Sequence, residues 1–160
     1  DNPTIIIENK VEYGKTGKVK IPKGYEFNLL KTDTVPILLV EPEEAADTAI
    51  ICYGGYIDEA IESLEKLIIE GDLIPKVIII SQIDPFQEEI RILTETCDTI
   101  IFIEEGIDGG TVGDYFISKI CQKKGNINFK NLSSERIAIP SARTLEKKMM
   151  AKLDLSKIIT

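Results

Sequence analysis

The chain has 160 residues, of which 43% are hydrophobic and 29% are charged, a balance typical of a globular domain with a buried core. Its formal net charge of −8 disfavours nucleic acid or an anionic membrane as a partner, because both require clustered basic residues. No apolar run is long enough to cross a bilayer. The sequence also contains no histidine, so we expect little acid–base chemistry near neutral pH.

The first strand-like segment is Thr4–Ile7, a short β-branched run that no companion strand follows closely. It is either an edge strand of this domain or the last strand of a preceding one. Residues 8–34 then have the composition of a linker or docking arm. The aromatic side chains that could anchor this arm are Tyr13, Tyr25 and Phe27.

From Val35 onward, apolar strands alternate with amphipathic helices. The expected strands are Pro36–Val40, Thr48–Tyr53, Val77–Ile80, Thr99–Ile103 and Arg136–Ile139. The expected helices are Ile57–Glu70, Phe86–Thr96 and Asp114–Gln122, with terminal helical turns at Leu145–Met150 and Ser156–Ile159. Gly125–Ser134 is expected to be a polar loop.

Strands that are apolar almost throughout indicate a mostly parallel sheet with helices on both faces. Pro36 favours an edge position for the first strand, and the short turn after that strand makes its pairing with the second antiparallel. The sequence therefore predicts a three-layer α/β/α fold. Its mixed sheet has five strands, four of them parallel and one an antiparallel edge strand.

The three cysteines, Cys52, Cys97 and Cys121, stand far apart, each in or beside an apolar run. We interpret them as small buried side chains rather than metal ligands, because no Cys-x-x-Cys or Cys/His pattern is present. Their number and spacing also favour a reducing, cytoplasmic setting. No metal, catalytic or cofactor-binding residue is expected in the chain.

A pair of carboxylates and a cluster of glycines follow the strand Thr99–Ile103. They are Glu104, Glu105, Gly106, Gly109, Gly110 and Gly113. They stand at the carboxyl edge of the predicted sheet, where open α/β sheets usually meet ligands or partners. Adjacent side chains on a strand point to opposite faces, so Glu104 and Glu105 are poorly placed as an acid–base couple. We expect them to bond backbone N–H groups of the glycine turn or to support a subunit contact.

Two glycine turns each connect a predicted strand to a predicted helix, and each has two possible roles. Gly54–Gly55 and Gly109–Gly110 could present backbone N–H groups to a small anion, or they could simply be tight turns. The spacing at Gly109, Gly110 and Gly113 departs from G-x-G-x-x-G, and no P-loop motif is present. A free-standing small-anion-binding module is one hypothesis that this pattern permits.

Several motifs in order resemble the C-terminal domain of the transketolase-like, thiamine-diphosphate-dependent enzymes. The resemblance is closest to the beta subunit of the decarboxylating component of 2-oxo acid dehydrogenase complexes. The residues that carry it are Pro3–Lys10, Ala49–Gly54 with Glu59-Ala60, Ile103–Glu105 with Gly109, Gly110 and Gly113, Ile139–Ala142 with Leu145-Glu146, and Leu155–Ile159.

The resemblance implies that residues 1–34 end a preceding pyrimidine-binding domain and its linker, and that residues 35–160 form the C-terminal domain. A chain that begins at Asp1 without methionine fits the expectation of an excised piece. In the whole enzyme, thiamine diphosphate and Mg would be held by other domains, and this fragment alone would bind neither and be inactive. The C-terminal domain supplies subunit contacts.

The family implies other domains and subunits of the same enzyme as partners, and in the dehydrogenase complexes a docking surface for a lipoyl acyltransferase core. We also expect a homo-oligomer, because a C-terminal domain cut from its neighbours exposes apolar surface that tends to self-associate. The residues we expect to have interface or structural roles are Tyr53, Gly54, Glu104, Glu105, Gly109, Gly110 and Gly113.

The chain also departs from the family pattern. Ser81–Asp84 lacks the arginine that relatives often carry after the preceding strand, and the segment between Arg136 and Pro140 is shorter than usual. Asn131 stands where relatives have an aspartate that helps to hold the acyltransferase. These differences weaken acyltransferase docking and leave a transketolase or deoxyxylulose-phosphate synthase relative as the alternative.

Overall fold

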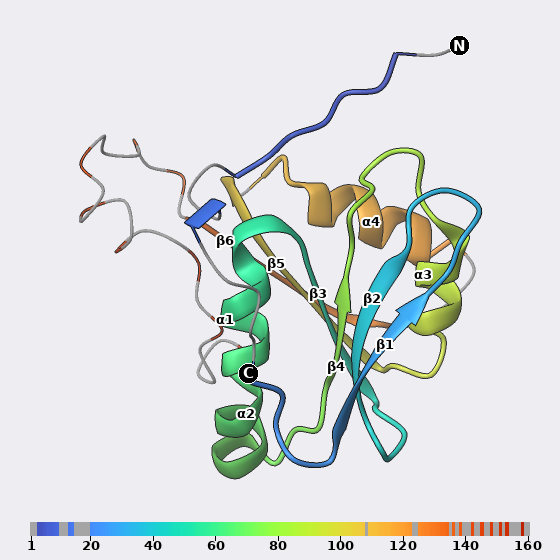
Figure 1. Ribbon diagram of the computed structural model, residues 1–160, viewed down its shortest axis with the longest axis vertical. Coiled ribbons are helices and arrows are strands. Elements are labelled where there is room, and N and C mark those ends of the chain that lie inside the picture. Colours follow the sequence, from blue (N-terminus) through green and yellow to red (C-terminus); the bar gives the residue numbers. More distant parts are fainter. Residues whose placement is uncertain are drawn as a thin grey trace.

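The computed structural model describes residues 3–9, 13–14, 20–107, 109–122 and 125–134, together with the single positions 136, 138, 142, 145, 148, 151, 153 and 158. Its centre is a twisted six-stranded sheet in the order β1-β2-β4-β3-β5-β6, with helices on both faces (Figure 1). The strands are β1 (Tyr25–Leu30), β2 (Ile37–Pro42), β3 (Thr48–Cys52), β4 (Lys76–Ile79), β5 (Thr99–Ile107) and β6 (Asn128–Ser134). The helices are α1 (Ile57–Glu62), α2 (Leu64–Gly71), α3 (Glu88–Leu93) and α4 (Val112–Ile120), with a 3-10 turn, η2, at Gly54–Tyr56.

The strand directions confirm the expected mixed α/β class. β3 runs parallel to both β4 and β5, and β5 runs parallel to β6, which gives the four parallel strands that the apolar pattern predicts. β2 is antiparallel to its neighbours β1 and β4. The sheet has six strands rather than five.

Two segments that the sequence assigned to loops are edge strands. Tyr25–Leu30, placed in the linker, is β1, and Asn128–Ser134, placed in a polar loop, is β6. Both are mostly exposed or only partly buried, because each lies at an edge of the sheet. Polar residues therefore interrupt the apolar pattern of both segments. The strand expected at Arg136–Ile139, like the terminal helical turns, falls largely outside the described residues.

The predicted edge position of the first strand is also wrong. β2 lies between β1 and β4, and β4 separates it from β3, although the β2–β3 connection is short. Pro36 precedes the strand and Pro42 is its last residue, so neither proline interrupts the ladder that Leu38–Val40 makes with β4. A proline at a strand end is compatible with a central strand for this reason.

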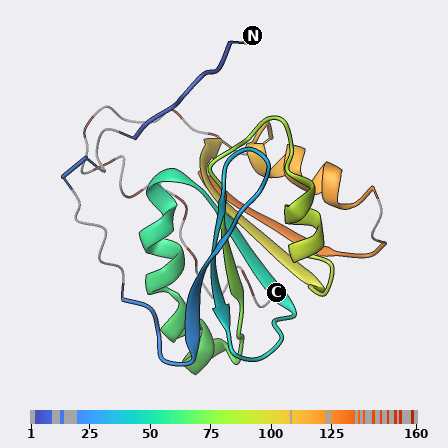
Figure 2. The ribbon, with the colours of Figure 1, turned by 45° about the vertical axis from the view of Figure 1, so that its right-hand side comes forward.

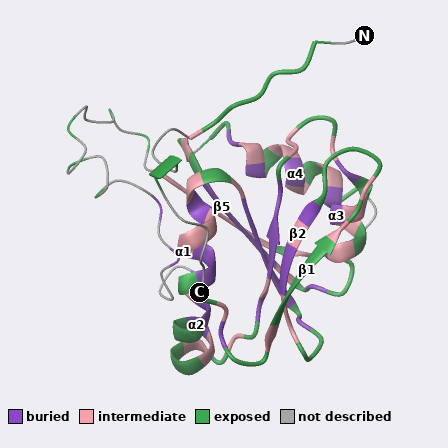
Figure 3. Cartoon of the chain, viewed as in Figure 1, coloured by how far each residue is buried: buried purple, intermediate pink, exposed green. Residues whose placement is uncertain are grey.

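The core consists of two apolar layers, one on each face of the sheet, and burial is concentrated in the central strands (Figure 3). Alternate side chains of β3 belong to different layers. Ile50 and Cys52 face one side of the sheet, and Ala49 and Ile51 face the other. Helices α1 and α2 cover the first layer, and α3 and α4 cover the second (Figure 2).

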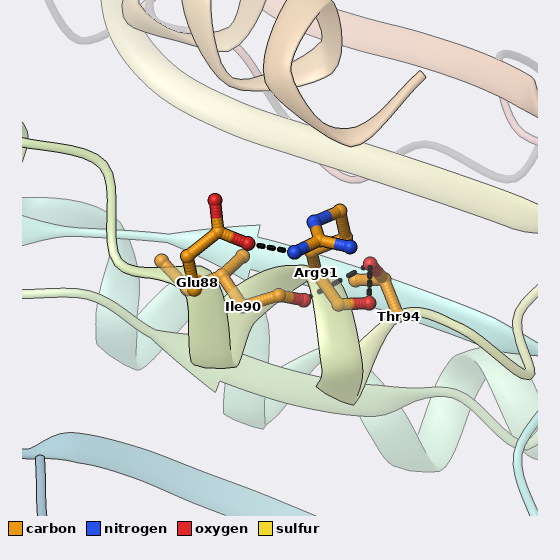
Figure 4. Close-up of polar contacts among 4 residues, drawn as sticks. All are labelled: Glu88, Ile90, Arg91 and Thr94. Atoms are coloured by element: carbon orange, nitrogen blue, oxygen red, sulfur yellow. Dashed lines mark hydrogen bonds and ion pairs between the residues drawn. The ribbon is translucent and has the colours of Figure 1, made fainter. Parts of the chain in front are cut away.

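The single helix expected over Ile57–Glu70 is divided at Ser63 into α1 and α2. The Ser63 hydroxyl donates to the Ala60 carbonyl at 2.9 Å, a local bond that competes with the helical ladder. Helix α3 ends in a similar way, because the Thr94 hydroxyl lies within 3.0 Å of the Ile90 carbonyl and 3.1 Å of the Arg91 carbonyl (Figure 4). Glu88 pairs with Arg91 on the exposed side of that helix. Within the described part of the chain, no helix has the length and apolar character needed to cross a membrane.

The segment Thr4–Ile7 takes no part in the sheet and extends away from it (Figure 1). Ile5, Ile6 and Ile7 are 86%, 80% and 85% exposed. Three consecutive isoleucines exposed to water are unfavourable, because each would gain about 1.5–3 kcal/mol from full burial. This segment is therefore suited to burial against a structure beyond the described sheet.

The buried thiol and phenols of the first core layer predict instability in alkali. Burial raises the pKa of Cys52 from 9.0 to about 12, and it raises the pKa of Tyr25 and of Tyr56 from 10.0 to about 12. The unfolded chain releases these protons at a lower pH than the folded chain. We therefore expect the free energy of unfolding to be unaffected by these groups below about pH 9 and to fall as the pH rises towards 12. The decrease is at most about 1.4 kcal/mol per pH unit for Cys52, and it is smaller for the half-buried Tyr25, which solvent screens.

Urea unfolding at a series of pH values from neutrality to about pH 11 measures this dependence. The variant Cys52→Ala should show a shallower decrease than the wild-type chain, because it lacks one of the titrating groups. An unfolding free energy that stays constant over this range would contradict the assignment.

Candidate functional site

The candidate site is the junction where β5 ends and α4 begins, and Glu104 is at its centre. This glutamate is only 1% exposed. Its carboxylate accepts hydrogen bonds from the backbone N–H of Val112 at 3.0 Å and of Gly113 at 2.8 Å. A buried carboxylate is costly unless it is hydrogen-bonded, and here the amides at a helix N-terminus compensate the charge. Glu104 therefore connects the strand to the helix.

Tyr53, at the end of β3, gives Glu104 a third partner. Its hydroxyl donates to the Glu104 carboxylate at 3.1 Å. Burial raises the pKa of Tyr53 above its ordinary value, and the charge and hydrogen bond of Glu104 raise it further. The phenol consequently stays protonated near neutral pH and acts as a donor rather than as a base.

The remaining N–H groups at the start of α4 are satisfied by a capping box. The Thr111 hydroxyl accepts from the Asp114 N–H at 3.2 Å, and the Asp114 carboxylate accepts from the Thr111 N–H at 3.1 Å. Together with the two amides bonded to Glu104, the four N–H groups at residues 111–114 all have side-chain partners. This helix start has no free N–H group in that set to offer a small anion.

Gly113 lies in the most crowded position of the junction. A Cβ there would lie 2.9 Å from Asn131 Nδ2, 2.9 Å from Glu104 Oε1 and 3.0 Å from Phe102 Cγ. Gly113 is thus required for close packing of α4 against β5 and β6. Asn131 donates from its amide to Thr111, and its carbonyl oxygen is buried. The Asn131 side chain thus takes part in the internal contacts of the junction.

The other glycines of the two turns and the second glutamate are near the surface. Gly54, Gly109 and Gly110 are exposed, and Gly54 and Gly109 have positive φ angles of 57° and 91°. A positive φ is strained for residue types other than glycine, so the turns at these two positions require glycine. Glu105 is exposed, on the opposite face of β5 from Glu104.

The structure therefore divides the residues expected at interfaces into two groups. Tyr53, Glu104 and Gly113 are brought together inside the junction. Gly54, Glu105, Gly109 and Gly110 form the exposed rim of the same sheet edge. The sequence pattern did not assign Thr111 and Asp114 to the site, and it marked Asn131 only as a departure from the family pattern, without its contact to Thr111. The Thr-x-x-Asp spacing at the start of an apolar helix is the signal that identifies the first two.

None of the three cysteines forms a disulfide, and only two of them are buried. Cys52 and Cys97 lie in the core as expected, whereas Cys121 follows α4 and is exposed. The expectation that all three are buried is wrong for Cys121, because the last helical turn faces solvent at this position. Among the described residues, no group of three or more histidine, cysteine or acidic side chains is placed to hold a metal ion.

Replacement of Thr111 by alanine should destabilise the chain by about 1 kcal/mol, the usual cost of removing an N-cap side chain. The variant loses the acceptor for the Asp114 N–H and a partner of Asn131. Thermal and urea unfolding measure the change. Ser118→Ala is the control, because the exposed Ser118 hydroxyl bonds the Tyr115 carbonyl within the same helix. Equal stabilities of the two variants would show that the capping box contributes nothing.

No protein-family model matches the sequence, and no curated protein matches it. Among solved structures, a split-gene transketolase in an inactive beta4 tetramer matches with a TM-score of 0.58 at 18% identity. The match covers 70% of this chain and 37% of that one.

Two further structures match with a TM-score of 0.45. A 2-oxoglutarate:ferredoxin oxidoreductase from Magnetococcus marinus, with 2-oxoglutarate, coenzyme A and succinyl-CoA bound, is 21% identical over 61% of this chain and 16% of its own. A Staphylococcus aureus protein whose esterase assignment is provisional is 14% identical over 78% of this chain and 48% of its own. The chain thus shares its fold with a part of the split-gene transketolase chain that is little more than a third of that protein's length.

Proposed function

We propose that this chain is the C-terminal, subunit-association domain of a thiamine-diphosphate-dependent 2-oxo acid dehydrogenase of the beta-subunit type. In the whole enzyme, the reaction would be oxidative decarboxylation of a 2-oxo acid with acyl transfer to lipoamide. The observation that carries the proposal is an agreement between sequence and structure. The motifs that resemble this family occur in the right order, and the sheet to which two of them contribute, as β3 and β5, has the fold of part of a transketolase.

The residues of the candidate site do not fit thiamine diphosphate. The N–H groups that could bind a diphosphate at α4 are bonded to Glu104, Thr111 and Asp114. The chain has no histidine, and its described part places no metal-binding cluster. We therefore assign the cofactor and Mg to other domains, and we assign the β5–α4 junction a structural role.

The exposed rim is the part of the chain that we propose to contact neighbouring domains or subunits. Gly54, Glu105, Gly109 and Gly110 lie where β3 and β5 end, so a partner could approach the backbone closely there. The detached Thr4–Ile7 segment supports the same view. Its exposed isoleucines are explained if they are buried in a preceding pyrimidine-binding domain, with residues 8–24 as the connection to β1.

The transketolase alternative is favoured by one specific observation, the structural match to a split-gene transketolase. Ketol transfer between sugar phosphates would then replace decarboxylation in the whole enzyme. The structure adds no support for acyltransferase docking at Asn131, whose amide bonds Thr111 inside the junction. The small-anion-binding module loses support at Gly109–Gly110, where the adjacent helix amides are already bonded.

The experiment that tests the proposal is an assay of the native enzyme, purified from its source through a tag on this chain. We expect thiamine-diphosphate-dependent reduction of ferricyanide with a 2-oxo acid such as pyruvate or 2-oxoglutarate. Ketol transfer between xylulose 5-phosphate and ribose 5-phosphate, with no 2-oxo acid activity, would establish the alternative. A homogeneous native protein without thiamine diphosphate and without either activity would refute both.

A further inference from the structure

Strand β1 presents an unpaired edge. The sheet ends at β1, and within the described residues no strand lies beyond it. The Glu43 N–H donates to the Gly24 carbonyl at 3.0 Å, and the register continues with Tyr25 opposite Pro42. Since hydrogen-bonded and non-hydrogen-bonded pairs alternate along antiparallel strands, the backbone groups of Phe27 and Leu29 point away from β2. These N–H and C=O groups are free to pair with another strand.

The same two residues also expose apolar side chains. Phe27 and Leu29 are each 52% exposed, and they lie on one face of β1 with Tyr25. Strand edges are usually protected by lysine, proline or a bulge, yet the β1 sequence YEFNLL has Glu26 as its single charged residue. The edge thus combines free backbone groups with apolar surface, as in sites where a strand is added to a sheet.

We propose that β1 pairs antiparallel with β1 of a second copy of this chain, which joins two sheets across a two-fold axis at Phe27. In this register, the N–H and C=O groups of Phe27 bond Phe27 of the other copy. The Leu29 N–H bonds the carbonyl of the other copy's Tyr25. The free edge is therefore self-complementary, as an isologous contact requires.

Charge also favours this register over one of its neighbours. It places the Glu26 carboxylate of each copy opposite the Asn28 amide of the other, and this amide lies 3.5 Å from the Glu41 carboxylate of its own chain. One N–H of Asn28 can thus bond Glu26 of the other copy while the second bonds Glu41. A shift that placed Tyr25 opposite Phe27 would bring the two Glu26 carboxylates face to face, which is destabilising. The interface is independent of the proposed reaction, and it would hold for the isolated chain.

Sedimentation equilibrium of the 160-residue chain tests the proposal. We expect the wild-type chain to have twice the mass of one chain at concentrations of about 100 μM. Phe27→Lys and Leu29→Lys should each be monomeric, with unchanged circular dichroism. Their urea unfolding should match that of the wild-type chain only at concentrations low enough for the wild type to dissociate, because dimer formation itself adds to apparent stability. Ile92→Lys is the matched control, because Ile92 is 64% exposed on α3 and lies outside the interface. It should remain dimeric.

A crosslinking experiment tests the register. In a Cys121→Ser background, chains with Glu26→Cys and chains with Asn28→Cys are oxidised separately and as a mixture. Non-hydrogen-bonded pairs have Cα atoms about 4.5 Å apart, within the range of a disulfide. We expect disulfide-linked dimers in the mixture and not in either variant alone. A monomeric wild-type chain, a dimer that persists in both lysine variants, or crosslinking of Asn28→Cys alone would overturn the proposal.

Discussion

Replacement of Glu104 by alanine is expected to lower the free energy of unfolding by about 3–5 kcal/mol, because two backbone amides and one phenol lose their acceptor at once. Each buried donor that remains without a partner costs about 1–3 kcal/mol. Urea unfolding measures the loss. Glu104→Gln should cost less, since an amide oxygen can still accept from one or two of these donors.

The control for this substitution is Glu105→Ala at the neighbouring position. Glu105 is exposed, and its removal should change stability by no more than about 0.5 kcal/mol. Near-ultraviolet circular dichroism should report the altered environment of Tyr53 in the Glu104 variants only. Equal unfolding free energies for Glu104→Ala and Glu105→Ala would contradict the structural role of the buried carboxylate.

Replacement of Gly113 by alanine is expected to destabilise the chain by about 2–3 kcal/mol, although alanine is the better helix former by about 1 kcal/mol. The added methyl group would lie within 3.0 Å of Asn131, Glu104 and Phe102, so helix α4 must move away from the sheet. This movement would lengthen the bonds from Val112 and Gly113 to Glu104. Urea unfolding and amide hydrogen exchange in α4 measure both effects.

Gly110→Ala is the matched control, because a Cβ at Gly110 would meet no atom within 4 Å and its φ is not positive. Its stability should equal that of the wild-type chain. The double variant Gly113→Ala with Asn131→Ala should recover part of the loss, since one of the three clashes is removed. If Gly113→Ala were as stable as Gly110→Ala, the close packing described for this junction would be wrong.

The centre of the fold could be predicted from the sequence because burial on both faces makes the parallel strands apolar throughout. The strands β3, β4 and β5 have this character, and the helices after them show the expected apolar spacing. The edges could not be predicted in the same way. Strand β6 is largely polar and resembles a loop in composition. Strand β1 alternates apolar and polar residues, which is itself a strand signal, but it follows a segment rich in glycine and lysine and was assigned with it to the linker.

The order of the strands depends on contacts that the sequence pattern does not contain. The turn between β2 and β3 is short, which suggests that they are neighbours, yet β4 pairs with both and separates them. This strand order results from pairing between segments that are distant in the sequence. With β1 on one side and β4 on the other, β2 has hydrogen-bond partners for the backbone groups along both of its edges.

The candidate site was predictable in its position but not in its internal contacts. The opposite directions of Glu104 and Glu105 follow from strand alternation. Whether Glu104 is buried depends on α4 folding back so that its N-terminal amides meet the carboxylate, which is a tertiary contact. The Thr111–Asp114 capping box is local and could have been found from its spacing. The hydrogen bond from Asn131 to Thr111 joins β6 to the start of α4. This contact could not have been found from the sequence, because no local spacing indicates it.

A two-dimensional ¹H–¹⁵N NMR experiment on the chain tests the central claim that the β5–α4 junction is a closed structural element rather than a cofactor site. We expect the amide protons of Val112 and Gly113 to exchange as slowly as those of the central strands. Their chemical shifts should stay constant when thiamine diphosphate and Mg²⁺ are added. Rapid exchange of both amides, or saturable shifts of these two signals on addition of the cofactor, would contradict the account.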